Sequence, residues 1–158
     1  MQDERPKHDG HVGRQRLQQV LLNLLTNAIK YNHAGGTVSV IEAPAHTLVA
    51  TLPVGGGPAS LALHGASGRL YVANQLTKSI SVIDTATRVL IDTLTLSDIP
   101  DRLLVHPGTG HLYVLSQATG DLAIIDPQTH AASNVSVFDG VNLAAHDMAM
   151  DSSGAVIY

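Results

Sequence analysis

Residues 68–87 read GRLYVANQLTKSISVIDTAT, and residues 110–129 repeat the pattern as GHLYVLSQATGDLAIIDPQT. The two stretches are 42 residues apart, and the same step separates residues 40–42 (VIE) from residues 82–84 (VID). A repeat of about 40 to 45 residues that is filled with short alternating strands is typical of a β-propeller blade. A helical repeat would instead show a 3.6-residue period inside each unit.

Four strands can be placed within one period of this repeat. Alternating or aliphatic runs predict strands at residues 79–83, 89–94, 102–105 and 111–115. Between them lie stretches rich in Asp, Thr, Pro and Gly, which favour turns. Four antiparallel strands per period are what one propeller blade contains.

The sequence therefore predicts a mainly β chain, a partial β-propeller of about three four-stranded antiparallel blades after an N-terminal amphipathic α-helix. The blades are expected at about residues 35–76, 77–118 and 119–158, with the last one incomplete. Propellers close with about four to eight blades, so three leave the ring open. We expect the chain to be a fragment of a longer protein, or alternatively to self-associate through its open blade edges.

The helix is predicted at residues 14–34, after a polar leader at residues 1–13 that we expect to be disordered. Residues 14–32 contain no glycine or proline. Apolar side chains recur there at helical spacing, namely Leu17, Val20, Leu21, Leu24, Leu25 and Ala28. Gly35 and Gly36 follow, and glycine commonly ends a helix.

The β region resembles the YVTN-type β-propeller repeat over residues 35–158. The resemblance rests on residues 58–63 (PASLAL), 68–74 (GRLYVAN) and 79–87 (SISVIDTAT). The chain lacks tryptophan, and with it the Trp-Asp signature of WD40 blades. This resemblance implies a non-catalytic binding or scaffold module whose propeller face receives a partner protein or a cell-envelope ligand.

The helical segment resembles the N-box helix of sensor histidine kinases, in the ATP-binding domain of these two-component proteins. The match covers residues 16–32 (RLQQVLLNLLTNAIKYN). The resemblance implies that Asn27 would ligate Mg²⁺, that Asn23 would lie beside it, and that Lys30 and Tyr31 would approach the nucleotide. An amide oxygen suits Mg²⁺ as a hard ligand, and lysine supplies a compact charge for phosphate.

The other parts of that kinase family are not visible in the sequence. No glycine-bearing adenine box, glycine-rich lid or phosphoacceptor helix accompanies the N-box segment. We therefore expect no catalytic residue and no cofactor, and interpret the segment as a fused or truncated piece. The alternative is an ATP-binding remnant of a sensor kinase, fused to a propeller sensor and holding ATP and Mg²⁺.

Composition narrows the remaining function classes. A formal net charge of −4 argues against nucleic-acid binding, which usually needs a basic face. No apolar run approaches the roughly 20 residues that span a bilayer, and residues 1–13 lack the apolar core of a signal peptide. Localisation stays open, because the kinase resemblance implies cytoplasm, whereas many YVTN-type propellers are periplasmic or extracellular.

Two further groups of polar residues are interpreted as structural. Asp84 and Asp126 follow strands at equivalent positions, and an Asp side chain can bond the backbone two residues ahead, so we interpret both as turn residues rather than metal ligands. The nine histidines include the repeat equivalents His64 and His106, and none form a metal-binding pair on a helix. We interpret them as structural or surface residues.

Overall fold

Strands form where the alternation of the second repeat predicted them. They are β5 (Ser79–Asp84), β6 (Val89–Thr95), β7 (Arg102–Val105) and β8 (Leu112–Leu115). The structure is a computed structural model and describes residues 35–43, 45–116, 119–136, 148–151 and 154–157. The predicted leader at 1–13 and helix at 14–34 lie outside these residues. Within the described ranges, no helix is long and apolar enough to cross a membrane.

Two complete sheets have four antiparallel strands each. In the first, β3 (Pro58–His64) and β4 (Arg69–Asn74) precede β5 and β6, with the order β3-β4-β5-β6. In the second, β7 and β8 precede β9 (Asp121–Ile125) and β10 (Ala132–Ser136), in the same meander order. The fold is therefore mainly β, as predicted.

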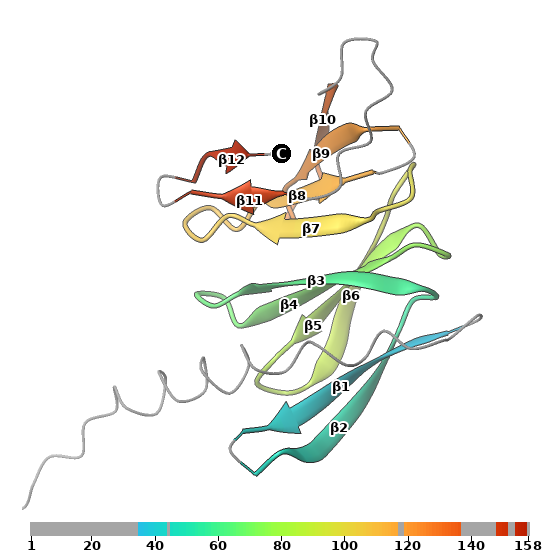
Figure 1. The fold of residues 1–158 in the computed structure, drawn as a ribbon, viewed down its shortest axis with the longest axis vertical. Coiled ribbons are helices and arrows are strands. Elements are labelled where there is room, and N and C mark those ends of the chain that lie inside the picture. Colours follow the sequence, from blue (N-terminus) through green and yellow to red (C-terminus); the bar gives the residue numbers. More distant parts are fainter. Residues whose placement is uncertain (1–34, 44, 117–118, 137–147, 152–153, 158) are drawn as a thin grey trace, which may run out of the picture.

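A two-stranded sheet stands at either end of the described chain. β1 (Gly36–Glu42) pairs with β2 (Thr47–Val54), and β11 (Ala149–Met150) pairs with β12 (Val156–Ile157). The sheets follow one another along the long axis of the molecule, and β3 of the first complete sheet lies beside β7 of the second (Figure 1). The inner strands of neighbouring blades are thus in contact.

The grouping of strands into sheets differs from the blade boundaries predicted at 35–76, 77–118 and 119–158. The predicted unit at 77–118 joined β5 and β6 to β7 and β8, whereas the structure pairs β5 with β4 and leaves β6 and β7 in different sheets. The repeat period defines the length of a blade but not its first strand. The connection between β4 and β5 and the connection between β6 and β7 are both short loops. The sequence pattern is therefore compatible with either grouping of the strands.

The main core lies between the two complete blades. It combines buried side chains from both, listed here: Ala62, Tyr71, Ala73, Ile80, Val82, Leu94, Leu103, Leu112, Val114 and Ile125. The central strands β4 and β5 are buried along nearly their whole length, since neighbouring blades cover both of their faces. The outer strand β6 is largely exposed. Packing between blades, rather than within one sheet, therefore holds this arc together.

Candidate functional site

Two families of turns form one rim of the blades, and left-handed residues recur in them. His46, Arg88 and His130, each 42 residues from the next, have φ values of 53°, 59° and 60°. Gly68 and Gly110, also 42 residues apart, have φ values of 65° and 76°. Such φ values cost side-chain-bearing residues more than glycine. Equivalent turns therefore share one backbone geometry and place equivalent side chains along the rim.

The turn role predicted for Asp84 is confirmed. Its Oδ1 accepts hydrogen bonds from the backbone of Ala86 at 3.0 Å, and from the backbone and hydroxyl of Thr87 at 2.8 and 2.9 Å. The bonds from Thr87 are the main cause that lowers the pKa of Asp84 below its usual value. This carboxylate is therefore engaged in the turn.

Asp126 repeats this arrangement one blade later. Its Oδ1 accepts a bond from the backbone of Gln128 at 2.8 Å, and its Oδ2 accepts one from the hydroxyl of Thr129 at 2.9 Å. The backbone bond from Gln128 is the largest cause that lowers the pKa of Asp126. No group of three or more metal-ligating side chains lies together among the described residues.

His64 links the two complete blades. Its Nδ1 lies 2.7 Å from Ser67 Oγ, and its Nε2 lies 3.1 Å from the carbonyl oxygen of Pro107 in the next blade. A carbonyl only accepts, so in the neutral ring Nε2 carries the proton and Nδ1 accepts the hydroxyl of Ser67. His106 instead accepts bonds at Nδ1 from the backbone of Gly108 and Thr109, both at 3.1 Å. Both histidines thus have a structural role, as predicted, but His64 bonds across blades and His106 bonds within its own turn.

A second link joins the blades nearer their outer strands. His130 Nε2 lies 2.9 Å from Asp92 Oδ2, so the turn between β9 and β10 bonds the outer strand of the preceding blade. Between this link and the one from His64 lies an open cleft of about 480 Å³, which we call the inter-blade cleft. Its lining residues are His64, Ser67, Arg69, Tyr71, Asp92, Thr109, Gly110, Pro127, Gln128 and His130.

The inter-blade cleft offers both donors and acceptors on a rigid frame. Arg69 is exposed, whereas Tyr71 is almost fully buried beneath it. Burial raises the pKa of Tyr71, with Arg69 opposing the rise and Asp126 adding to it. The phenol therefore remains a hydrogen-bond donor at neutral pH. This arrangement suits the recognition of a polar chain segment, because guanidinium, imidazole and amide groups line the same cleft.

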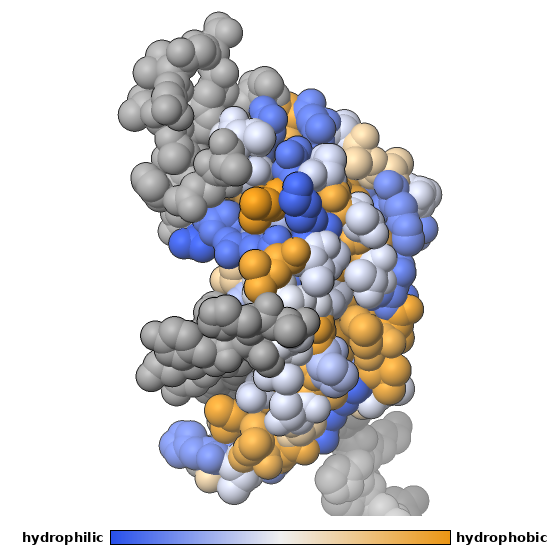
Figure 2. Space-filling model, turned by 90° about the vertical axis from the view of Figure 1, so that its right-hand side faces the viewer, coloured by the Kyte–Doolittle hydropathy of each residue, from blue (hydrophilic) through white to orange (hydrophobic). Residues whose placement is uncertain are grey.

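A second surface feature is apolar and lies on the outer strands. Exposed side chains there include Leu48 at 62% and Val89 at 53%, on β2 and β6 respectively. Val49, Leu90 and Ile91 continue the same strands and are also exposed. Figure 2 shows several hydrophobic groups on one face of the molecule. We call these five exposed residues the outer strip.

The site residues predicted from the kinase resemblance, Asn23, Asn27, Lys30 and Tyr31, lie outside the described residues. The inter-blade cleft consists of other residues, and the sequence indicates only part of its arrangement. The 42-residue step relates positions 46, 88 and 130, but the contact between His130 and Asp92 does not follow from that step, because it depends on how the blades pack.

No family model matches the chain, and no curated protein matches it. Among solved structures the chain is similar to hydrazine synthase of Kuenenia stuttgartiensis, with a TM-score of 0.66 and 19% identity over 75% of this chain and 34% of that chain. Sqt1 of Saccharomyces cerevisiae gives a TM-score of 0.59 and 15% identity over 73% of this chain and 32% of that chain.

The β-propeller domain of Cps50 (Swd1) from Myceliophteria thermophila gives a TM-score of 0.54 and 13% identity, over 63% of this chain and 32% of the other. The chain thus spans about a third of the length of the solved structures it matches. At these identities the likeness shows the fold alone, which is that of a β-propeller.

Proposed function

We propose that this chain is a non-catalytic scaffold module of the YVTN propeller type, part of a longer repeat protein, which binds a partner protein through the inter-blade cleft. The observation that carries the proposal is the cleft itself. The bonds His64 to Pro107 and His130 to Asp92 join the two blades at this cleft, and polar side chains line it. Rigid frames of this kind commonly present loops for binding.

The partner segment that fits the cleft is polar and carries an acidic group. Arg69 at the opening is exposed and suits a carboxylate, which guanidinium binds through paired bonds. Gln128, also exposed, offers an amide that both donates and accepts, which suits the backbone of an extended segment. The outer strip supplies a separate apolar surface on which a second contact, including one with another copy of the chain, would form.

A displayed library of random peptides tests the proposal. We expect selection on the full chain to enrich acidic peptides whose affinity falls at least about tenfold for Arg69→Ala and Gln128→Ala, since central arginines often dominate interfaces. Lys78→Asn is the matched control: it also removes an exposed positive charge, but from a turn on the opposite rim, and Asn tolerates its φ of 45°. Equal affinity for all four proteins would refute the cleft as binding surface.

The second candidate is an ATP-binding remnant of a sensor kinase, favoured by the sequence of residues 16–32. It rests on Asn23, Asn27, Lys30 and Tyr31 alone. Thermal unfolding with and without millimolar MgATP tests it, because a ligand that binds only the folded chain raises the midpoint. A rise that disappears in Asn27→Ala would favour this candidate, and an unchanged midpoint would exclude it.

A further inference from the structure

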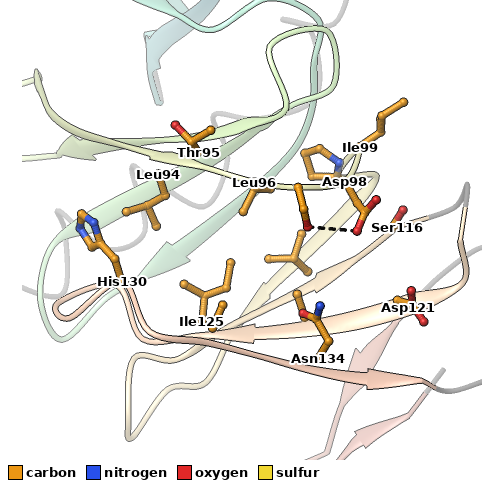
Figure 3. Close-up of a pocket in the computed structure, with 15 residues that line it drawn as sticks. Leu94, Thr95, Leu96, Asp98, Ile99, Ser116, Asp121, Ile125, His130 and Asn134 are labelled. Carbon is orange, nitrogen blue, oxygen red and sulfur yellow. Dashed lines mark hydrogen bonds between the residues drawn. The ribbon is translucent and has the colours of Figure 1, made fainter.

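A small cavity lies between the two complete blades and shares His130 with the inter-blade cleft. It has a volume of about 140 Å³, opens to solvent, and is lined by β6, the following segment 96–100, and strands β8, β9 and β10 (Figure 3). Leu94, Val114 and Ile125 line it and are buried. Apolar cavities of about 150 Å³ in proteins accept a molecule of the size of benzene. The space therefore suits one compact apolar group.

Comparison between repeats explains why this space is open. Three lining positions carry shorter side chains than their equivalents one period earlier: Ser116, Ala123 and Ala132 stand where the preceding blade has Asn74, Ser81 and Leu90. In that preceding blade two of the longer side chains, those of Asn74 and Ser81, meet. Asn74 Nδ2 donates to Ser81 Oγ at 3.0 Å, and the backbone of Gly55 donates to the same oxygen at 3.3 Å. The cavity thus belongs to one interface of the repeat.

Ser116 provides a buried polar group at this cavity. Its side chain is only 5% exposed, and within the part of the chain that the structure describes its Oγ has no hydrogen-bond partner. Its backbone N–H and carbonyl are bonded to Asp121 and Gly120. A buried hydroxyl without a partner disfavours the folded state, so such a group calls for a ligand atom that bonds it.

The charges around the cavity select the chemistry of that ligand. Figure 3 shows Asp98, Ser116 and Asp121 at one end of the cavity and His130 at the other. Asp98 accepts a hydrogen bond from the hydroxyl of Ser97 at 3.1 Å. The Asp98 carboxylate at the same end as a buried hydroxyl favours a ligand that is a cation with several donors over an anion.

We propose that this cavity binds a small primary amine on a compact apolar body. The ammonium group lies at the end formed by Asp98, Ser116 and Asp121 and donates a hydrogen bond to the hydroxyl of Ser116. The apolar body fills the space between Leu94 and Ile125. This site does not depend on the proposed protein partner of the inter-blade cleft.

Benzylamine is the probe for this proposal, and amide chemical shifts of the full chain in two-dimensional NMR are the readout. We expect saturable shifts at Ser116 and Ile125, with a Kd on the order of 1 mM, as is usual for a ligand with so few atoms. Benzoate has a similar size but the opposite charge, and benzyl alcohol lacks the charge. We expect no saturable shifts with benzoate, and affinity at least about fivefold weaker with benzyl alcohol.

Two variants separate the head group from the cavity. Ser116→Ala removes the hydroxyl and should weaken benzylamine binding at least about fivefold, while the ligand-free variant unfolds at the same or a higher temperature because the unpaired group is gone. Ala132→Leu introduces the residue of the equivalent position 90 and should weaken binding at least about tenfold by filling the space. Unchanged affinity in either variant, equal binding of benzoate, or no saturable shift at the cavity would overturn the proposal.

Discussion

Truncation of Leu112 tests whether the contact between blades holds the fold together. The side chain is fully buried, in the cluster that also contains Ile80 and Leu94 of the preceding blade. Leu112→Ala removes three carbon atoms, each worth about 0.8 kcal/mol of transfer free energy, and the residual cavity adds roughly 1 kcal/mol. We expect the free energy of unfolding to fall by about 3 kcal/mol, a large part of the roughly 5–15 kcal/mol of a typical domain.

Leu90→Ala is the matched control for this prediction. It removes the same three carbons from a side chain that is 42% exposed, so we expect a loss of only about 1 kcal/mol. Urea unfolding followed by far-ultraviolet circular dichroism measures both losses, and tyrosine fluorescence checks that the transition is two-state. Losses that agree within about 0.5 kcal/mol would refute the reasoning, because burial between blades would then contribute nothing beyond ordinary surface packing.

Three further predictions concern the turns and the interface. The lowered pKa of Asp84 means that its stabilising effect is present above about pH 4, the usual pKa in the unfolded chain, and is lost as pH falls through the lower pKa of the folded chain. The difference in unfolding midpoint between wild type and Asp84→Ala should therefore shrink from pH 7 to pH 2. A constant difference would contradict this. Gly68→Ala, at a φ of 65°, should cost about 1 kcal/mol in urea unfolding, whereas Arg88→Gly, at 59°, should cost nothing or stabilise by up to about 1 kcal/mol; the opposite order would show that these turns are not strained. Asn74→Ala should destabilise by about 1–3 kcal/mol because its amide bonds two buried serines, and a loss below about 0.5 kcal/mol would argue against that network.

The strands of this fold could be predicted from sequence because their signal is local. Alternation placed β5, β6 and β7 within one or two residues of their observed bounds, and Asp84 followed three residues later by Thr87 identified a turn. The division into sheets was not predictable in this way. Whether β6 ends a sheet or continues one depends on contacts between blades, and the sequence repeats with the same period in either case.

The candidate sites were less predictable, because they arise from differences between repeats and from contacts across them. His64 and His106 are equivalent in sequence, yet the ring of His64 bonds Pro107 of the next blade while that of His106 bonds the backbone of its own turn. The cavity at Ser116 follows from its being shorter than Asn74. A position-by-position comparison of the two repeats contains that signal, although only coordinates show that the shorter side chains share one space.

The constant 42-residue step has a consequence for how such a protein changes its length over time. When one whole 42-residue repeat is duplicated or deleted, the residue at the junction is followed by the residue that normally follows its equivalent in another repeat. The order of strands and turns is therefore unchanged wherever the break falls. An unequal crossover between repeats would therefore add or remove a blade without creating a new type of loop. Such an event would destabilise the interfaces between blades, because a side chain such as Asn74 would then pack against residues that normally surround Ser116.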